Sequence, residues 1–234
     1  MPDYLYIPSV DLRIGGLEEH NRQQRRKAIK SLEDQKKRRC ITLSREYGCE
    51  AYPVAEKLCQ IMQKQSGEEW VLMDKALLDA VAHHHDLSTE ILKSLGDQNR
   101  YLVEFLSTFS SRWKSHEEHF RLLSKYIISL AEEGNVVIMG RGSAVVTHHL
   151  DNCYHFKLFA SMNFKIASIA RRLNMDTEEA EKLIEKRQLQ RDRFNREYLN
   201  LHKHDLRYYD MLFNNDRMTS DTIAETIADY VLKQ

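Results

Sequence analysis

Residues 40–58 read CITLSREYGCEAYPVAEKL, and this stretch decides the fold. Residues 40–44 form a short apolar run typical of a buried strand, Gly48 marks a turn, and residues 54–58 begin a helical pattern. A strand, a turn and a helix N-terminus together make an anion site, because the unpaired amides and the helix dipole point outward. The stretch therefore predicts a place where phosphates bind.

Four further apolar runs have the length and composition of strands, and they occupy residues 70–73, 136–140, 154–159 and 211–214. The segments between them are too long for hairpins and carry helical patterns, which favours parallel crossovers. We expect an α/β fold of three layers, with a mainly parallel five-stranded sheet and helices on both faces. Ligands of such sheets bind at the carboxyl ends of the strands.

Helix signals place the remaining parts of this domain. The sequence Asp-Thr-Glu-Glu at 176–179 has the spacing of a capping box, and it predicts a lid-like helix over about 176–200. Apolar residues that recur every four positions after residue 220 predict a terminal amphipathic helix. Residues 75–133 are mainly helical in pattern, and we expect this insertion to lie on the acceptor side of the site.

The first 38 residues form a separate extension in front of the domain that we assign to residues 39–234. The first 39 residues hold ten basic and six acidic side chains, and residues 16–39 favour a charged helix. This helix is either a solvated surface helix or an arm that binds phosphates, a protein partner or a second copy of the chain.

The composition limits the classes of partner. Lys plus Arg and Asp plus Glu both number 35, so no global field draws the 234-residue chain to nucleic acid or to an anionic membrane. No apolar run approaches the length of a membrane-spanning helix, and we expect a cytoplasmic protein. The cysteines and histidines show no zinc or metal-ligand spacing, so no metal site in the protein is predicted.

By its residues alone, the segment after the first strand reads as an ordinary strand-to-helix turn, and as a phosphate loop it would be a degenerate form of the Walker A motif. A working loop of this kind uses several glycines, a lysine and a Ser or Thr that binds magnesium, whereas here only Gly48 is glycine and Tyr52 occupies the usual magnesium-binding position. A carboxylate at Glu50 would repel a triphosphate by about 4 kcal/mol at a separation near 4 Å. Arg45 could supply the missing positive charge. The residues that we predict to contact the donor are Ser44, Arg45, Tyr47, Gly48, Cys49, Glu50, Ala51 and Tyr52.

The order of five motifs resembles the cytidylate kinase-like family of P-loop proteins over residues 39–234. These motifs are ITLSREYG at 41–48, MDK at 73–75, VIMGRG at 137–142, an arginine-bearing helix, and YDMLFN at 209–214. The resemblance implies a phosphotransferase of the nucleoside-monophosphate kinase type that uses ATP and Mg²⁺. Family members usually continue SREYG with Ser-Gly-Gly, and this chain has Cys49-Glu50-Ala51 instead.

The same resemblance implies an acceptor site and a catalytic helix. Asp74, Lys75 and Arg141 would hold the acceptor nucleotide, although Asp74 could equally be a helix N-cap. The aspartate that usually follows the family arginine is replaced here by Gly142, so cytidine specificity is not supported.

Arg187 and Arg191 share one helix face and would offset the charge of the transferred phosphoryl group. They could instead belong to a solvated basic helix paired with nearby glutamates. Gln188 stands where an aspartate is usual.

Two functions follow from these observations. Retention of Arg141 and Arg191 favours an ATP-dependent kinase acting on a small nucleotide. The altered loop and Gln188 favour a non-catalytic member that senses a ligand or binds a protein.

Overall fold

A central buried strand organises the sheet. The computed structural model describes residues 38–78, 116–201 and 205–234. Strand β1 (Cys40–Arg45) pairs in parallel with β3 (Val136–Met139) on one side and with β4 (Cys153–Phe159) on the other. Most side chains of β1 and all of those of β3 are buried, as expected for parallel strands that are covered on both faces.

Two edge strands complete the sheet. Strand β2 (Val71–Met73) pairs with β3, and β5 (Met211–Asn214) pairs with β4, both in parallel. The order is β2-β3-β1-β4-β5, which confirms the five-stranded parallel sheet predicted from the apolar runs. The carboxyl ends of these strands consequently meet along one edge of the sheet.

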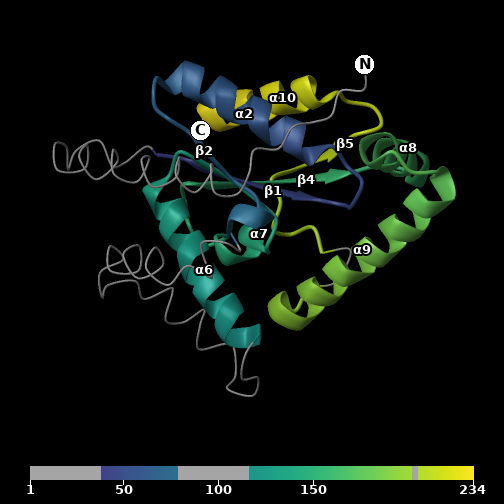
Figure 1. The fold of residues 1–234 in the computed structure, drawn as a ribbon. Helices are drawn as coiled ribbons and strands as arrows, with labels where there is room; N and C mark the ends of the chain where they lie inside the picture. The colour runs from purple at the N-terminus through teal and green to yellow at the C-terminus, as the bar shows by residue number, and fades with distance from the viewer. Residues whose placement is uncertain (1–37, 79–115, 202–204) are drawn as a thin grey trace.

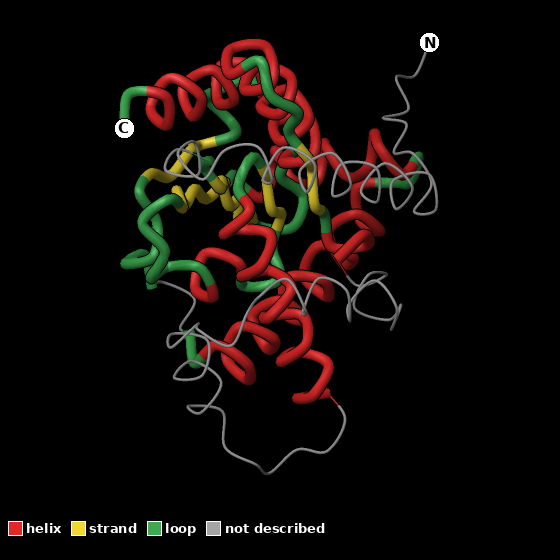
Figure 2. The backbone as a smooth tube through the Cα atoms, turned by 90° about the vertical axis from the view of Figure 1, so that its left-hand side faces the viewer, coloured by secondary structure: helices red, strands yellow, loops and turns green. Residues whose placement is uncertain are grey.

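Helices cover both faces of the sheet (Figures 1 and 2). Helices α2 (Ala51–Ser66) and α10 (Ser220–Leu232) lie above it in Figure 1, and α6 (His116–Glu133) and α7 (Ser143–Val146) lie below it. Their apolar stripes enclose two separate hydrophobic clusters, one on each face. This arrangement confirms the predicted three layers.

A pair of helices extends beyond β4. Helix α8 (Met162–Leu173) begins at the cap Ser161, and α9 (Thr177–Leu199) begins at the cap Asp176, whose side chain accepts a hydrogen bond from the Glu179 amide. The N-cap bond that the predicted capping box requires is therefore present. Helix α9 returns beneath the sheet toward α6 (Figure 1), so one of its faces is available to a site at the strand ends.

The structure corrects one predicted helix boundary, and other predictions fall on residues outside the described ranges. Helix α2 begins at Ala51 rather than at residue 54, because Pro53 fits in a first turn, where its missing N–H is not needed. The N-terminal extension at 1–38, apart from its last residue, and most of the 75–133 insertion lie outside the described ranges. None of the helices within those ranges is long and apolar enough to cross a bilayer.

Candidate phosphate-binding cleft

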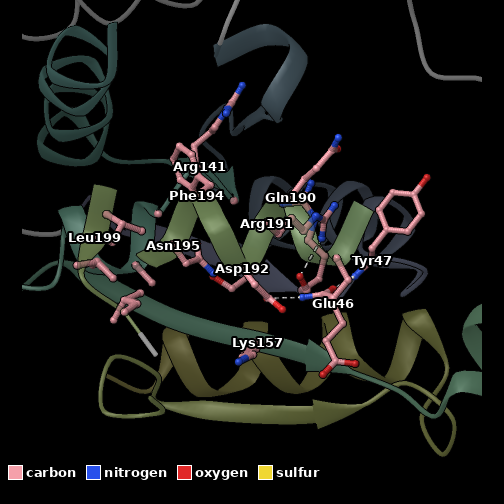
Figure 3. Close-up of a pocket in the computed structure, with 18 of the residues that line it drawn as sticks. Glu46, Tyr47, Arg141, Lys157, Gln190, Arg191, Asp192, Phe194, Asn195 and Leu199 are labelled. Carbon is pink, nitrogen blue, oxygen red and sulfur yellow. Dashed lines mark hydrogen bonds between the residues drawn. The ribbon is translucent and has the colours of Figure 1, made fainter. Parts of the chain in front are cut away.

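A cleft of about 580 Å³ opens at the carboxyl ends of β1 and β3, beneath the sheet and against α9. Its walls come from the end of β1, the turn after β3, the middle of β4 and one face of α9 (Figure 3). Among the described residues, the charged side chains that line it are six basic ones and two carboxylates: Arg45, Lys75, Arg141, Lys157, Arg187 and Arg191, with Glu46 and Asp192. The excess of positive charge makes the cleft suited to an anion.

Arg45 occupies the inner end of the cleft. Its guanidinium lies so close to the backbone of Gly140 that a Cβ added to this glycine would come within 2.3 Å of Nη1. Burial, together with the nearby positive charges of Arg191 and Arg141, lowers the pKa of Arg45 to about 9, while Asp74 opposes the shift. A bound anion would relieve this repulsion among arginines.

The turn after β3 is shaped by three successive left-handed residues. Gly140, Arg141 and Gly142 have φ angles of 77°, 55° and 73°. This conformation is uncommon for arginine, and it brings the Arg141 guanidinium to 5.6 Å from the centre of the Phe194 ring of α9. A Cβ at Gly142 would meet Leu199 Cδ1 at 2.5 Å, so the end of α9 packs where the usual aspartate side chain would begin.

Helix α9 contacts the phosphate loop directly. Arg191 Nη1 donates to the carbonyl oxygen of Arg45 at 2.9 Å, and its guanidinium lies 5.3 Å from the centre of the Tyr47 ring. Burial lowers the pKa of Arg191. In Figure 3, Arg141 and Phe194 lie together on one side of Arg191 and Tyr47 lies on the other. The helix thus brings its arginine between the loop and the Gly140–Gly142 turn.

Four amides of the phosphate loop already donate to protein oxygens. The Glu46 amide donates to Leu158 O at 3.0 Å and the Cys49 amide to Glu46 O at 3.4 Å. Two other bonds use side-chain amides from distant segments: Tyr47 N–H donates to Gln188 Oε1 at 2.9 Å, and Glu50 N–H donates to Asn215 Oδ1 at 2.8 Å. These contacts fix the shape of the loop.

Glu50 points away from the cleft. Its carboxylate accepts hydrogen bonds from Arg171 and from Ser168, both on α8. The predicted repulsion between Glu50 and a triphosphate is therefore reduced, because the charge is paired outside the cleft.

A second ion pair ties the loop to α8. Lys165 Nζ lies 2.9 Å from Glu46 Oε2, and the Lys165 stem packs against Gly48. Two acidic loop residues are thus neutralised by one helix.

The predicted site residues divide into two groups. Those that line the cleft are Ser44, Arg45, Tyr47, Lys75, Arg141, Arg187 and Arg191, and those outside its lining are Gly48, Cys49, Glu50, Ala51, Tyr52 and Asp74. Tyr52 packs with the α2–α10 cluster. Burial raises the pKa of Cys49 to about 12, which argues against a reactive thiolate. The ligand contacts of all these residues remain predictions.

Asp74 caps a helix, which is the alternative to acceptor binding that the sequence left open. Its Oδ1 accepts a hydrogen bond from the Leu77 amide at 2.9 Å, so it caps the helical residues 75–78. The capping bond occupies one carboxylate oxygen, and the next residue, Lys75, lies in the lining of the cleft.

Several lining residues were not predicted. Lys157 and Tyr209 form part of the cleft, and Lys157 Nζ lies 5.3 Å from the centre of the Tyr209 ring. Figure 3 shows Lys157 on β4, beneath α9. A lysine between the apolar residues Phe156 and Leu158 of a strand is a signal that could have identified it.

The cleft fits polyphosphate better than it fits a magnesium ion held by the protein alone. Glu46 is paired with Lys165, and Asp192 Oδ1 accepts a hydrogen bond from Gln188 Nε2 at 2.8 Å. Within the described ranges, no three His, Cys, Asp or Glu side chains cluster as potential metal ligands. A magnesium ion would accordingly take most of its ligands from nucleotide phosphates and water.

The chain is similar in sequence to one protein family and in fold to solved structures. The model of the cytidylate kinase-like family matches residues 40–217. An uncharacterized protein from Eubacterium ventriosum ATCC 27560 has a similar solved structure, with a TM-score of 0.63 and 21% identity over 85% of this chain and 100% of that chain. A shikimate kinase from Bacteroides thetaiotaomicron gives a TM-score of 0.44 and 13% identity over 84% of this chain and 99% of its own. No curated protein matches the sequence at a significant level.

Proposed function

This chain belongs to the cytidylate kinase-like family, and from that premise we propose that it is an ATP-dependent phosphotransferase with a small nucleotide as acceptor. The observation that carries the proposal is the convergence of Arg45, Arg141 and Arg191 on one cleft at the strand ends. The positive charges of Arg191 and Arg141 both lower the pKa of Arg45, and a bound phosphate would offset this repulsion. Phosphate oxygens are the anions that such planar donors bind best.

The roles follow from the elements that carry the arginines. Arg45 ends β1 and Arg191 comes from α9, so together they would bind the donor phosphates beside the loop. Arg141, from the turn after β3, and Lys75 would hold the acceptor. Arg187 is an exposed residue of the cleft lining and would close over the transferred group. Magnesium, bound to the donor phosphates, would neutralise part of their charge.

Phosphoryl transfer requires little covalent chemistry from the protein. Catalysis rests on alignment of donor and acceptor and on charge stabilisation of the transferred group. The attachment of the loop backbone to β4, to α9 and to Asn215 supports such alignment, because these distant segments accept its amide hydrogen bonds. Exclusion of water by α9 would strengthen each charge interaction.

Calorimetric titration with magnesium-ATP tests the donor site. The wild-type protein is expected to bind, and Arg45→Met to weaken binding about tenfold or more, because a buried charge-assisted contact is lost. Arg217→Met removes an exposed arginine outside the cleft and should leave affinity unchanged. Absence of wild-type binding, or equal affinity in both variants, would overturn the proposal.

The alternative is a nucleotide-binding member without turnover. The specific observation in its favour is that four loop amides are engaged by protein oxygens rather than left for phosphates. A coupled assay for ADP formation with CMP, dCMP and other monophosphates separates the two functions. Tight binding of ATP with no acceptor-dependent ADP formation would support the non-catalytic alternative.

A further inference from the structure

One side chain of α9 accepts a hydrogen bond from a backbone amide of the phosphate loop. Gln188 Oε1 accepts the Tyr47 N–H at 2.9 Å, and the contact is partly buried. This amide lies in the turn between β1 and α2, where the backbone donors of a phosphate loop are expected. A side-chain oxygen therefore sits where a ligand oxygen could accept the same hydrogen bond.

The orientation of the Gln188 amide is fixed from both ends. Its Nε2 donates to Asp192 Oδ1 at 2.8 Å, and a carboxylate can only accept. Tyr47 N–H can only donate, so the oxygen of Gln188 must face it. The position of the oxygen follows from two independent contacts.

Helix α9 does not depend on this contact alone to reach the loop. One turn further along, Arg191 bonds to the carbonyl oxygen of Arg45 and stacks near Tyr47. Loss of the Gln188 contact would thus leave the helix attached while freeing a backbone donor beside the cleft.

We propose that Gln188 is a displaceable substitute for a phosphate oxygen, which holds the Tyr47 amide until a polyphosphate enters and takes its place. The inference rests on the proposed function, because it assumes that the cleft receives a nucleotide. A charged phosphate oxygen accepts a stronger hydrogen bond than a neutral carboxamide oxygen does. Polyphosphates can therefore displace Gln188, and uncharged ligands cannot, so the side chain selects for highly charged ligands.

A graded set of variants tests the exchange with inorganic tripolyphosphate and magnesium-ATP as probes. Gln188→Ala removes the competitor and should tighten binding of both probes by about three- to tenfold, the value of one neutral hydrogen bond. Gln188→Glu provides a charged competitor and should weaken binding by a similar factor. Adenosine, which carries no phosphate, serves as the neutral probe and should show no change across the series.

Leu189→Ala is the matched control, because Leu189 lies on the same helix, is half exposed and is absent from the lining of the cleft. Amide hydrogen exchange of ligand-free protein tests the contact itself, and exchange at Tyr47 should accelerate in Gln188→Ala and not in Leu189→Ala. Unchanged or weaker polyphosphate binding in Gln188→Ala, with wild-type binding intact, would overturn the inference and leave the proposed function standing. No binding by any of the proteins would overturn both.

Discussion

Glycine is required at certain positions near the cleft, because neighbouring atoms lie in the space that a Cβ would need. Gly48 has a φ angle of 99°, and a Cβ there would lie 2.6 Å from Lys165 Cβ. Gly140 and Gly142 similarly leave room for Arg45 and Leu199. The approach of α8 to the loop, and of α9 to the β3 turn, consequently depends on missing side-chain atoms.

We expect Gly48→Ala to destabilise the protein more than Gly67→Ala does. Gly67 also has a left-handed φ, of 69°, but nothing lies within 4 Å of the position that a Cβ would take there. Gly67→Ala should therefore lower the free energy of unfolding by only about 1 kcal/mol, the backbone cost alone. Gly48→Ala adds the steric conflict with Lys165 and should cost roughly 1–3 kcal/mol more. Urea denaturation measures both, and equal losses would contradict the predicted conflict.

At the residue scale, sequence reasoning located charges better than it located their partners. Arg45 could be singled out because it ends an apolar strand pattern, whereas Arg141 and Arg191 were identified by the resemblance of their motifs to the cytidylate kinase-like family. The orientation of Glu50 could not, since its partners Arg171 and Ser168 lie on a helix more than a hundred positions away. Long-range pairing of polar side chains leaves no local pattern.

At the scale of elements, a buried polar pair joins two strands of the sheet. Thr42 Oγ1 on β1 and His155 Nδ1 on β4 lie 2.8 Å apart, and both side chains are buried. Burial lowers the pKa of His155 to about 4, His148 contributes to the lowering, and Asp210 opposes it. The imidazole is thus neutral in the folded protein under ordinary conditions.

This pair predicts a loss of stability in mild acid. Below its unfolded pKa of about 6.5, the unfolded chain takes up a proton that folded His155 does not accept until about pH 4. The contribution of neutral, buried His155 to the free energy of unfolding is complete above about pH 6.5, and it falls by up to roughly 3 kcal/mol as the pH approaches 4. His155→Gln cannot titrate, so the stability difference between wild type and this variant should shrink from about pH 7 to about pH 4.5. Urea titrations of both proteins measure it, and a constant difference would refute the assignment.

The elements themselves could be predicted because each strand is a short apolar run between long helical patterns. Boundaries shifted, as at α2, which begins at Ala51 rather than at residue 54 and holds Pro53 in its first turn, and helices α7 and α8 were not predicted as separate elements. The packing of α9 beneath the sheet could not be predicted from the sequence. The position of this helix depends on its contacts with Tyr47 and Arg45 rather than on its own residue pattern.

At the scale of the whole molecule, charge is balanced overall and unbalanced locally. Lys plus Arg equals Asp plus Glu over the chain, yet the part of the cleft lining that the structure describes holds six basic and two acidic side chains. The field that attracts a ligand therefore comes from one site and acts over a short range.

Binding of magnesium-ATP should consequently be sensitive to salt. We expect the dissociation constant to rise about tenfold between about 50 mM and 500 mM NaCl, as the screening length shortens. Adenosine has no phosphate and should bind with little dependence on salt. Calorimetry across this range provides the measurement, and an ATP affinity that does not respond to salt would argue against the cationic cleft as its site.

Because β1 lies at the centre of the sheet, it stays unpaired for part of the time that the chain is being translated. Thr42 and its partner His155 are 113 residues apart, and β3, the other neighbour of β1, also lies far downstream. At translation rates of about 5–20 residues per second, the apolar strand waits at the ribosome for roughly ten seconds before either neighbour emerges. A nascent chain exposed for that long is a natural client for chaperones, and the phosphate loop acquires its full set of contacts only after Gln188 and Asn215 have been made.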